Sequence, residues 1–224
     1  MSMPYYVSPE QIIADKAEFA RKGIARGRSV IVASASDAIY FVADNPSRAL
    51  HKIGEIYDRI GFAAVGRYNE FENLRVAGVR LADTRGYSYD RADVTVRTIA
   101  NAYAQTLGSI FIEAAKPFEV EIAVAQVGAT PDQDQLYRIS FDGSVHDQAG
   151  FICMGGDSET VGSHMEENWK IGDSAQDTLH AAVNALYPEA KPDITSLEVA
   201  VLSRKGDGRC FSRCSAELIT ELLS

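Results

Sequence analysis

"SVIVASASDAIYFVAD", residues 29–44, contains two β-rich runs that decide the fold class. The runs cover 29–36 and 38–44; both contain valine and isoleucine, and the second adds two aromatic residues, as is typical of strands. Ser36 and Asp37 between them form a turn that is far too short for a crossover helix. The stretch therefore predicts two antiparallel strands that are neighbours in one sheet.

Further strands and helices follow in groups. Two short strands are expected within 53–66, and their mostly apolar character indicates a sheet that is covered on both faces. The periodicity of apolar residues predicts helices at 68–86, 94–115, 158–170, 174–187 and 216–224, with strands at 119–128, 135–142, 150–156, 197–204 and 209–214. Asp93 is the expected N-cap of the helix at 94–115, and Lys116-Pro117 ends that helix.

The order of these elements favours an α+β architecture. Antiparallel strand groups are separated by pairs of helices, whereas a doubly wound fold would alternate single strands with single helices. Two stacked sheets with helices outside them fit this order. The 224 residues are 46% hydrophobic and contain no tandem repeat or low-complexity segment, so a single domain over 1–224 is expected.

A capped amphipathic helix over residues 9–26 precedes the first strand. Ser8 is the expected N-cap, Pro9 suits the first helical position, and Gln11 completes an S-x-x-Q capping box. The apolar face of the helix includes Ile12, Ile13, Phe19 and Ile24. Before the helix lies the apolar tip PYYVSP, and from the residues alone a frayed chain end is the simplest interpretation.

Charge and reactive residues narrow the classes of function. The net charge of −9 argues against a general nucleic-acid binder, which needs a basic surface. No stretch approaches the roughly 20 apolar residues that span a membrane, and no signal peptide is visible, so a cytoplasmic protein is expected. The three cysteines and four histidines are scattered, and we expect neither a metal site nor a cofactor.

Seven longer stretches carry a resemblance to a known family. They are YVSPEQ, EFARKGIARGRSV, FVADNPSRALHKI, YDRIGFAAVGRYNEFENLR, ADTRGYSYDR, NAYAQTLG and SLEVAVL. Taken in this order, they resemble the α subunits of actinobacterial proteasomes, from about Pro4 to Leu223. The resemblance implies a four-layer αββα sandwich of the N-terminal-nucleophile hydrolase type, with an extra N-terminal helix.

The resemblance also bears on catalysis. Catalytic relatives begin their first strand with a threonine whose free amine acts as the base. Arg28 falls at that position here, so no catalytic residue is expected, although Asp44 and Lys52 match the supporting aspartate and lysine. The alternative is an active N-terminal-nucleophile peptidase subunit that is cleaved before Ser29, which the stable helix over 9–26 disfavours.

A docking pocket follows from the resemblance alone. In α subunits of this family, the lysine that Lys52 matches lies between neighbouring subunits and pairs with the C-terminal carboxylate of a ring-shaped ATPase. The turn at Gly66 lines the same pocket. From the residues alone, Asp44 is a strand-end capping residue and Lys52 a solvated surface lysine.

The resemblance further implies an assembly. The α subunits would form the outer heptameric rings of a core particle, with β subunits in the inner rings and unfolded proteins as substrates. The ring-assembly surface would include Ile12, Ile13, Phe19 and Ile24. Residues 1–8 would be a flexible gate segment, and the gate would be formed by Pro4, Tyr5, Tyr6, Val7, Ser8 and Pro9.

Overall fold

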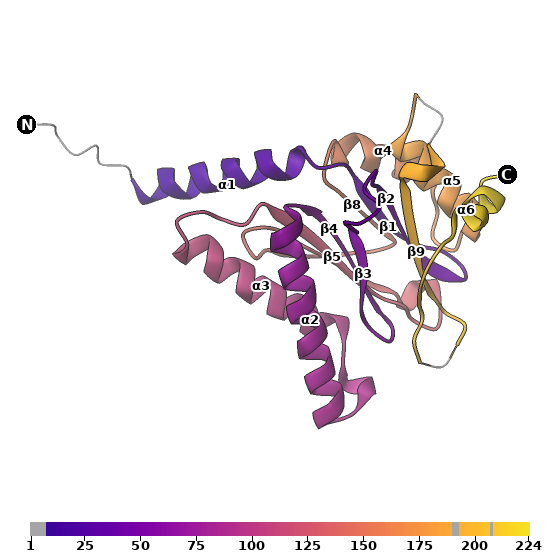
Figure 1. Cartoon of the computed structure of the whole chain (residues 1–224), viewed down its shortest axis with the longest axis horizontal. Coiled ribbons are helices and arrows are strands. Elements are labelled where there is room, and N and C mark those ends of the chain that lie inside the picture. The colour runs from indigo at the N-terminus through magenta and orange to yellow at the C-terminus, as the bar shows by residue number, and fades with distance from the viewer. Residues whose placement is uncertain (1–7, 190–192, 207) are drawn as a thin grey trace, which may run out of the picture.

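Two five-stranded antiparallel sheets form the centre of the computed structural model, which describes residues 8–189, 193–206 and 208–224 (Figure 1). The first sheet has the order β10-β9-β2-β1-β8, from β1 (Val30–Ser34), β2 (Ala38–Asp44), β8 (Phe151–Met154), β9 (Leu197–Ser203) and β10 (Phe211–Arg213). The second has the order β3-β4-β5-β6-β7, from β3 (Ile53–Tyr57), β4 (Ile60–Gly66), β5 (Val120–Gln126), β6 (Gln135–Ile139) and β7 (Val145–Gln148). The predicted hairpin is present, because β1 and β2 pair from Val30↔Ala43 to Ser34↔Ile39.

Helices cover the outer face of each sheet. The first sheet packs against α4 (Ser158–Asn168), α5 (Ala175–Leu186) and α6 (Ala216–Leu222). The second packs against α2 (Tyr68–Ser88) and α3 (Val96–Glu113). A third apolar cluster fills the space between the two sheets. These layers confirm the αββα sandwich, and α1 (Pro9–Ala25) is the extra N-terminal helix that runs along one end of it (Figure 1).

A buried ion pair joins the two sheets at the end where β1 finishes. Arg204 and Asp134 are 2.5 Å apart at Nη1 and Oδ1, and their side chains are 7% and 2% exposed. The Ser34 hydroxyl donates to Asp134 Oδ2 at 2.5 Å, and the Gly128 amide donates to Oδ1 at 2.9 Å. Because Ser34 belongs to the first sheet and Asp134 precedes β6 of the second, this cluster holds the layers together.

Three local features differ from the sequence-based expectation. Asp93 was the wrong N-cap for α3, because Thr95 begins that helix and its Oγ1 accepts the Thr98 amide at 3.3 Å. Asp93 instead lies in a 3₁₀ turn, Arg91–Asp93, that Asp90 caps. Strand β7 was not expected, since it is an exposed edge strand with a single apolar residue, Val145.

Neither a metal site nor a membrane-spanning helix is found in the part of the chain that the structure describes. Within those residues, no cluster of three or more histidine, cysteine or acidic side chains could hold a metal ion. The described helices likewise include none with the length and apolar character that crossing a membrane requires.

Candidate functional site

Arg28, Asp44 and Lys52 meet where the first two strands and the loop after them come together. The Arg28 guanidinium donates from Nη1 to both carboxylate oxygens of Asp44, each at 2.9 Å. Lys52 Nζ donates to the main-chain oxygen of Arg28 at 2.8 Å and to that of Asp44 at 3.0 Å. The structure therefore brings together the three residues that the resemblance singled out.

The backbone around this cluster is tightly positioned. The chain leaves α1 through Gly27, whose amide donates to Ile24 O at 2.9 Å, and Arg28 follows immediately. Glu198 of β9 accepts the Lys52 amide at 2.9 Å and lies 2.7 Å from the Arg213 guanidinium. The loop that carries Lys52 is thus held against the first sheet before β3 begins.

Burial alters the acidity of Lys52. Loss of solvation lowers the pKa of its ammonium group to about 8, against the opposing effect of the Asp44 and Glu198 charges. Arg28 adds a smaller effect in the same direction as burial. A lysine ammonium has three N–H donors, and two carbonyl acceptors are found for it among the described residues. Two of the three Lys52 donors are thus engaged with main-chain acceptors.

Gly66 lies at the end of β4 with φ +109°, a backbone conformation that favours glycine. A Cβ added there would lie 1.9 Å from the Glu119 carbonyl oxygen, so a larger residue does not fit. A Cβ added to Gly27 would lie 3.6 Å from the Gly66 amide nitrogen, which places Gly66 beside the turn that precedes Arg28. Lys52 lines a cavity of 280 Å³, and Gly66 is not among the residues that line this cavity.

The geometry around Ser29 bears on the peptidase alternative. Residues 26–29 connect α1 to β1, so Ser29 lies directly before the first strand. The Ser29 hydroxyl donates to the carbonyl oxygen of Gly155 at 3.2 Å. In this arrangement the Ser29 hydroxyl is engaged with a main-chain acceptor.

The predicted ring-assembly residues fall into two groups. Ile24 is 8% exposed and packs into the core between the sheets. Ile12, Ile13 and Phe19 are 46%, 56% and 47% exposed. A 480 Å³ groove runs beside this part of α1, lined by Ile12, Asp15, Lys16, Phe19, Ala115, Lys116 and Pro117. The N-terminal half of α1 therefore presents apolar surface that residues 8–189, 193–206 and 208–224 leave uncovered.

Most of the predicted gate lies outside the described residues, namely Pro4, Tyr5, Tyr6 and Val7. Ser8 and Pro9 begin α1 as predicted, and Ser8 Oγ accepts the Gln11 amide at 3.2 Å. The capping box is half formed, because the Gln11 side chain donates to Asp15 Oδ1 at 2.7 Å and does not turn back to Ser8.

Two residues that hold α1 in place were not predicted. Lys16 Nζ donates to the last carbonyl groups of α3 and the residue after it, at 3.1 Å to Phe111, 3.3 Å to Ile112 and 2.7 Å to Ala114. Gly23 faces Glu119 so closely that an added Cβ would lie 2.0 Å from its Oε2. A glycine inside a helical pattern was the one signal in the sequence for such a close approach.

Comparison with known proteins gives a consistent result over the whole chain. A family model described as "Proteasome subunit" matches residues 22–202. The chain is 55% identical to "Proteasome subunit alpha" of Kineococcus radiotolerans, over 100% of this chain and 99% of that one. It is 58% identical to the protein of the same name from Sanguibacter keddieii and 57% identical to that from Thermobifida fusca, over 100% of this chain and 90% and 91% of theirs.

Proposed function

Because the chain belongs to the proteasome subunit family, we propose that it is a non-catalytic α subunit of a cytoplasmic proteasome core. Full-length identity of 55–58% to chains named as α subunits is the observation that carries this proposal. The subunit, one domain over 1–224, forms the outer heptameric rings, and β subunits form the two inner rings. The particle admits unfolded proteins to the chamber where the β subunits cleave them.

The residue at the position of the catalytic threonine supports the non-catalytic role. Arg28 lies two residues before β1, and its side chain is engaged with Asp44. Cleavage before Ser29 would detach α1, which packs into the core through Ala20 and Ile24. The active-peptidase alternative predicts a mature chain that begins at Ser29, and an intact-mass measurement on assembled particles distinguishes the two. A retained residue 28 contradicts the alternative.

The exposed half of α1 supports ring assembly. Ile12, Ile13 and Phe19 together leave a patch that is apolar and half-exposed, as an uncovered subunit contact is. A neighbouring subunit that covers this patch would gain hydrophobic free energy of about 25 cal/mol per Å². Contacts of this kind repeat head to tail and close into a ring when the rotation between subunits is a simple fraction of a turn.

Activator docking is proposed at Lys52. Its ammonium group is anchored by two carbonyl groups and retains one donor for a ligand. The C-terminal carboxylate of a ring-shaped ATPase is a suitable ligand, since a compact ammonium group binds a carboxylate well. Gly66 lies beside Gly27, next to the Arg28 that Lys52 contacts, and is proposed as a second part of this docking site.

Gating is proposed for residues 1–8, with Ser8 and Pro9 as the fixed point from which Pro4, Tyr5, Tyr6 and Val7 reach the pore. The capped start of α1 supports this, because it sets the direction in which each tip leaves the helix. Deleting the tip should accelerate degradation of an unfolded protein by assembled particles.

The whole proposal is tested by co-expression with the β subunit of the same organism. Electron microscopy and native mass spectrometry should show seven copies of this chain at each end of a four-ring particle. A chain that stays monomeric beside assembled β subunits contradicts the proposed function.

A further inference from the structure

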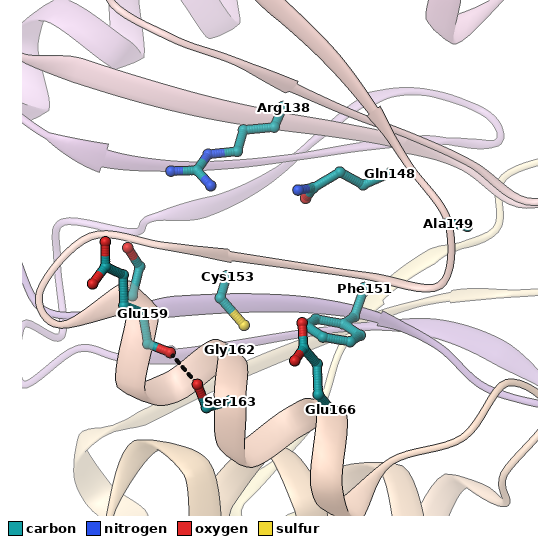
Figure 2. Close-up of a pocket in the computed structure, with 10 residues that line it drawn as sticks. Arg138, Gln148, Ala149, Phe151, Cys153, Glu159, Gly162, Ser163 and Glu166 are labelled. Carbon is teal, nitrogen blue, oxygen red and sulfur yellow. Dashed lines mark hydrogen bonds between the residues drawn. The ribbon is translucent and has the colours of Figure 1, made fainter.

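A cavity of 500 Å³ opens at the edge of the sandwich formed by β7, β8 and α4 (Figure 2). Arg138 and Gln148 line it from the second sheet, and Glu159 and Glu166 line it from α4. Phe151 of β8 forms an apolar part of its wall. The cavity is therefore an unfilled space with polar walls and a small apolar surface.

The walls of this edge cavity present acceptors that lack donors. Arg138 is already paired with Glu121, at 2.6 Å between Nη2 and Oε1. Within the described ranges, neither Glu159 nor Glu166 forms an ion pair, and the buried Oε1 of Gln148 has no hydrogen-bond donor. A group that fits this cavity must supply donors and positive charge, together with a short apolar side chain.

The opposite edge of the same two sheets carries such a set of groups. Loop 45–52 leads into the edge strand β3, and it exposes Arg48 and Leu50, with Leu50 48% exposed. Among the described residues, Arg48 forms no ion pair. The loop is internally braced, because Asn45 Nδ2 donates to Leu50 O at 2.8 Å and the Leu50 amide donates to Ser47 Oγ at 3.0 Å. The loop backbone that exposes Arg48 and Leu50 is thus held in place by its own hydrogen bonds.

We propose that Arg48 and Leu50 of one copy of this chain insert into the edge cavity of the next copy in the ring. Leu50 covers Phe151, while the Arg48 guanidinium donates to the carboxylates of Glu159 and Glu166. The two patches lie on opposite edges of the sandwich, which is what a head-to-tail contact requires, since a two-fold contact would use a single patch twice. This inference rests on the proposed function, and it identifies the two surfaces through which neighbouring subunits of the ring contact each other.

Charge reversal tests the contact in the full chain co-expressed with its β subunit, with native mass spectrometry to count rings and free chains. Arg48→Glu should raise the concentration needed for assembly about tenfold, because like charges then face each other. The double variant Glu159→Lys with Glu166→Lys should do the same, and combining it with Arg48→Glu should restore assembly. Glu167→Lys is the matched control, since Glu167 follows Glu166 on α4 but does not line the cavity.

A second variant fills the cavity without changing its charge. A Cβ added to Gly162 meets nothing within 4 Å and Gly162 lines the cavity, so Gly162→Phe should place its ring in the cavity and block the entry of Leu50. Normal ring formation by both Arg48→Glu and Gly162→Phe overturns this contact and leaves the proposed function intact. A wild-type chain that forms no ring beside β subunits overturns both the contact and the proposed function.

Discussion

Gly23 of α1 lies directly against the carboxylate of Glu119, so that a Cβ added to Gly23 would be 2.0 Å from Glu119 Oε2. The carboxylate has little room to retreat, because its side chain is 7% exposed and paired with Arg67 at 2.8 Å and Lys116 at 2.9 Å. Helix α1 can come this close to the residue before β5 only because residue 23 is a glycine, whose side chain is a hydrogen atom. This contact fixes how α1 lies on the sandwich.

Gly23→Ala should therefore destabilise the protein, although alanine is the better helix former. The alanine side chain favours the helix by about 0.5–1 kcal/mol, whereas overpacking a tight contact costs about 1–3 kcal/mol. Urea unfolding should show the lower free energy of unfolding, and hydrogen exchange should show faster exchange in α1. Gly162→Ala is the matched control, because an added Cβ meets nothing there and the substitution should stabilise α4. Equal stabilisation by both alanines would contradict the assigned contact.

Lys16 anchors the other half of α1 to the end of α3. Lys16→Met keeps the aliphatic stem but leaves the carbonyl groups of Phe111, Ile112 and Ala114 without their charged donor. Hydrogen bonds to a charged group contribute about 1.5–3 kcal/mol, so a loss of this order in the free energy of unfolding is expected. Lys22→Met is the control, because Lys22 pairs with the exposed Glu18 and its loss should change little. Similar losses of unfolding free energy in the two variants would show that the Lys16 hydrogen bonds to the end of α3 do not stabilise the protein specifically.

These two contacts illustrate what the sequence can and cannot predict. The hairpin of β1 and β2 and the helices of both outer layers follow from local patterns, because long periodic runs bury one face or both. Lys16 meets Phe111 across 95 positions of the chain, and no local pattern contains that pairing. Strand β7 was not predicted because an exposed edge strand needs no repeat of apolar residues, so its sequence carries no strand pattern.

In the candidate site, too, local sequence patterns predict some features and not others. Nothing in the spacing of Arg28, Asp44 and Lys52 indicates that they touch, and their proximity was expected from the resemblance alone. Thr95 and Asp93 are equally good N-caps by residue type. The choice between them depends on the turn that Asp90 closes just before α3.

The ion pair between Asp134 and Arg204 should contribute strongly to stability. Asp134→Asn keeps the shape of the side chain but leaves the buried Arg204 guanidinium without its counter-charge. Breaking one partner of a buried pair costs about 3–5 kcal/mol, so a loss of this order is expected in urea unfolding. Asp132→Asn is the matched control two residues away, because Asp132 is exposed. An Asp134→Asn chain as stable as the control would show that the cluster does not join the sheets.

Lys52 and Lys116 differ in the direction in which their pKa is shifted. Burial lowers the pKa of Lys52 to about 8. Burial also acts on Lys116, but hydrogen bonds and charges of Glu119 and Glu70 outweigh it and raise the pKa of that ammonium group. Between pH 8 and pH 10, Lys52 therefore loses its proton while Lys116 keeps its own.

If Lys52 binds the activator carboxylate, docking should weaken as the pH rises above 8. The protonated lysine is the binding form, so affinity should be constant below pH 8 and then fall by up to about tenfold per pH unit. Anisotropy of a labelled peptide that ends in the ATPase C-terminal sequence, titrated with assembled particles from pH 6.5 to 9.5, measures this. Lys52→Arg stays charged throughout and should show a flat profile at whatever affinity it retains, and Lys116→Arg should keep the wild-type profile. A wild-type affinity that stays constant to pH 9.5 would place the carboxylate elsewhere.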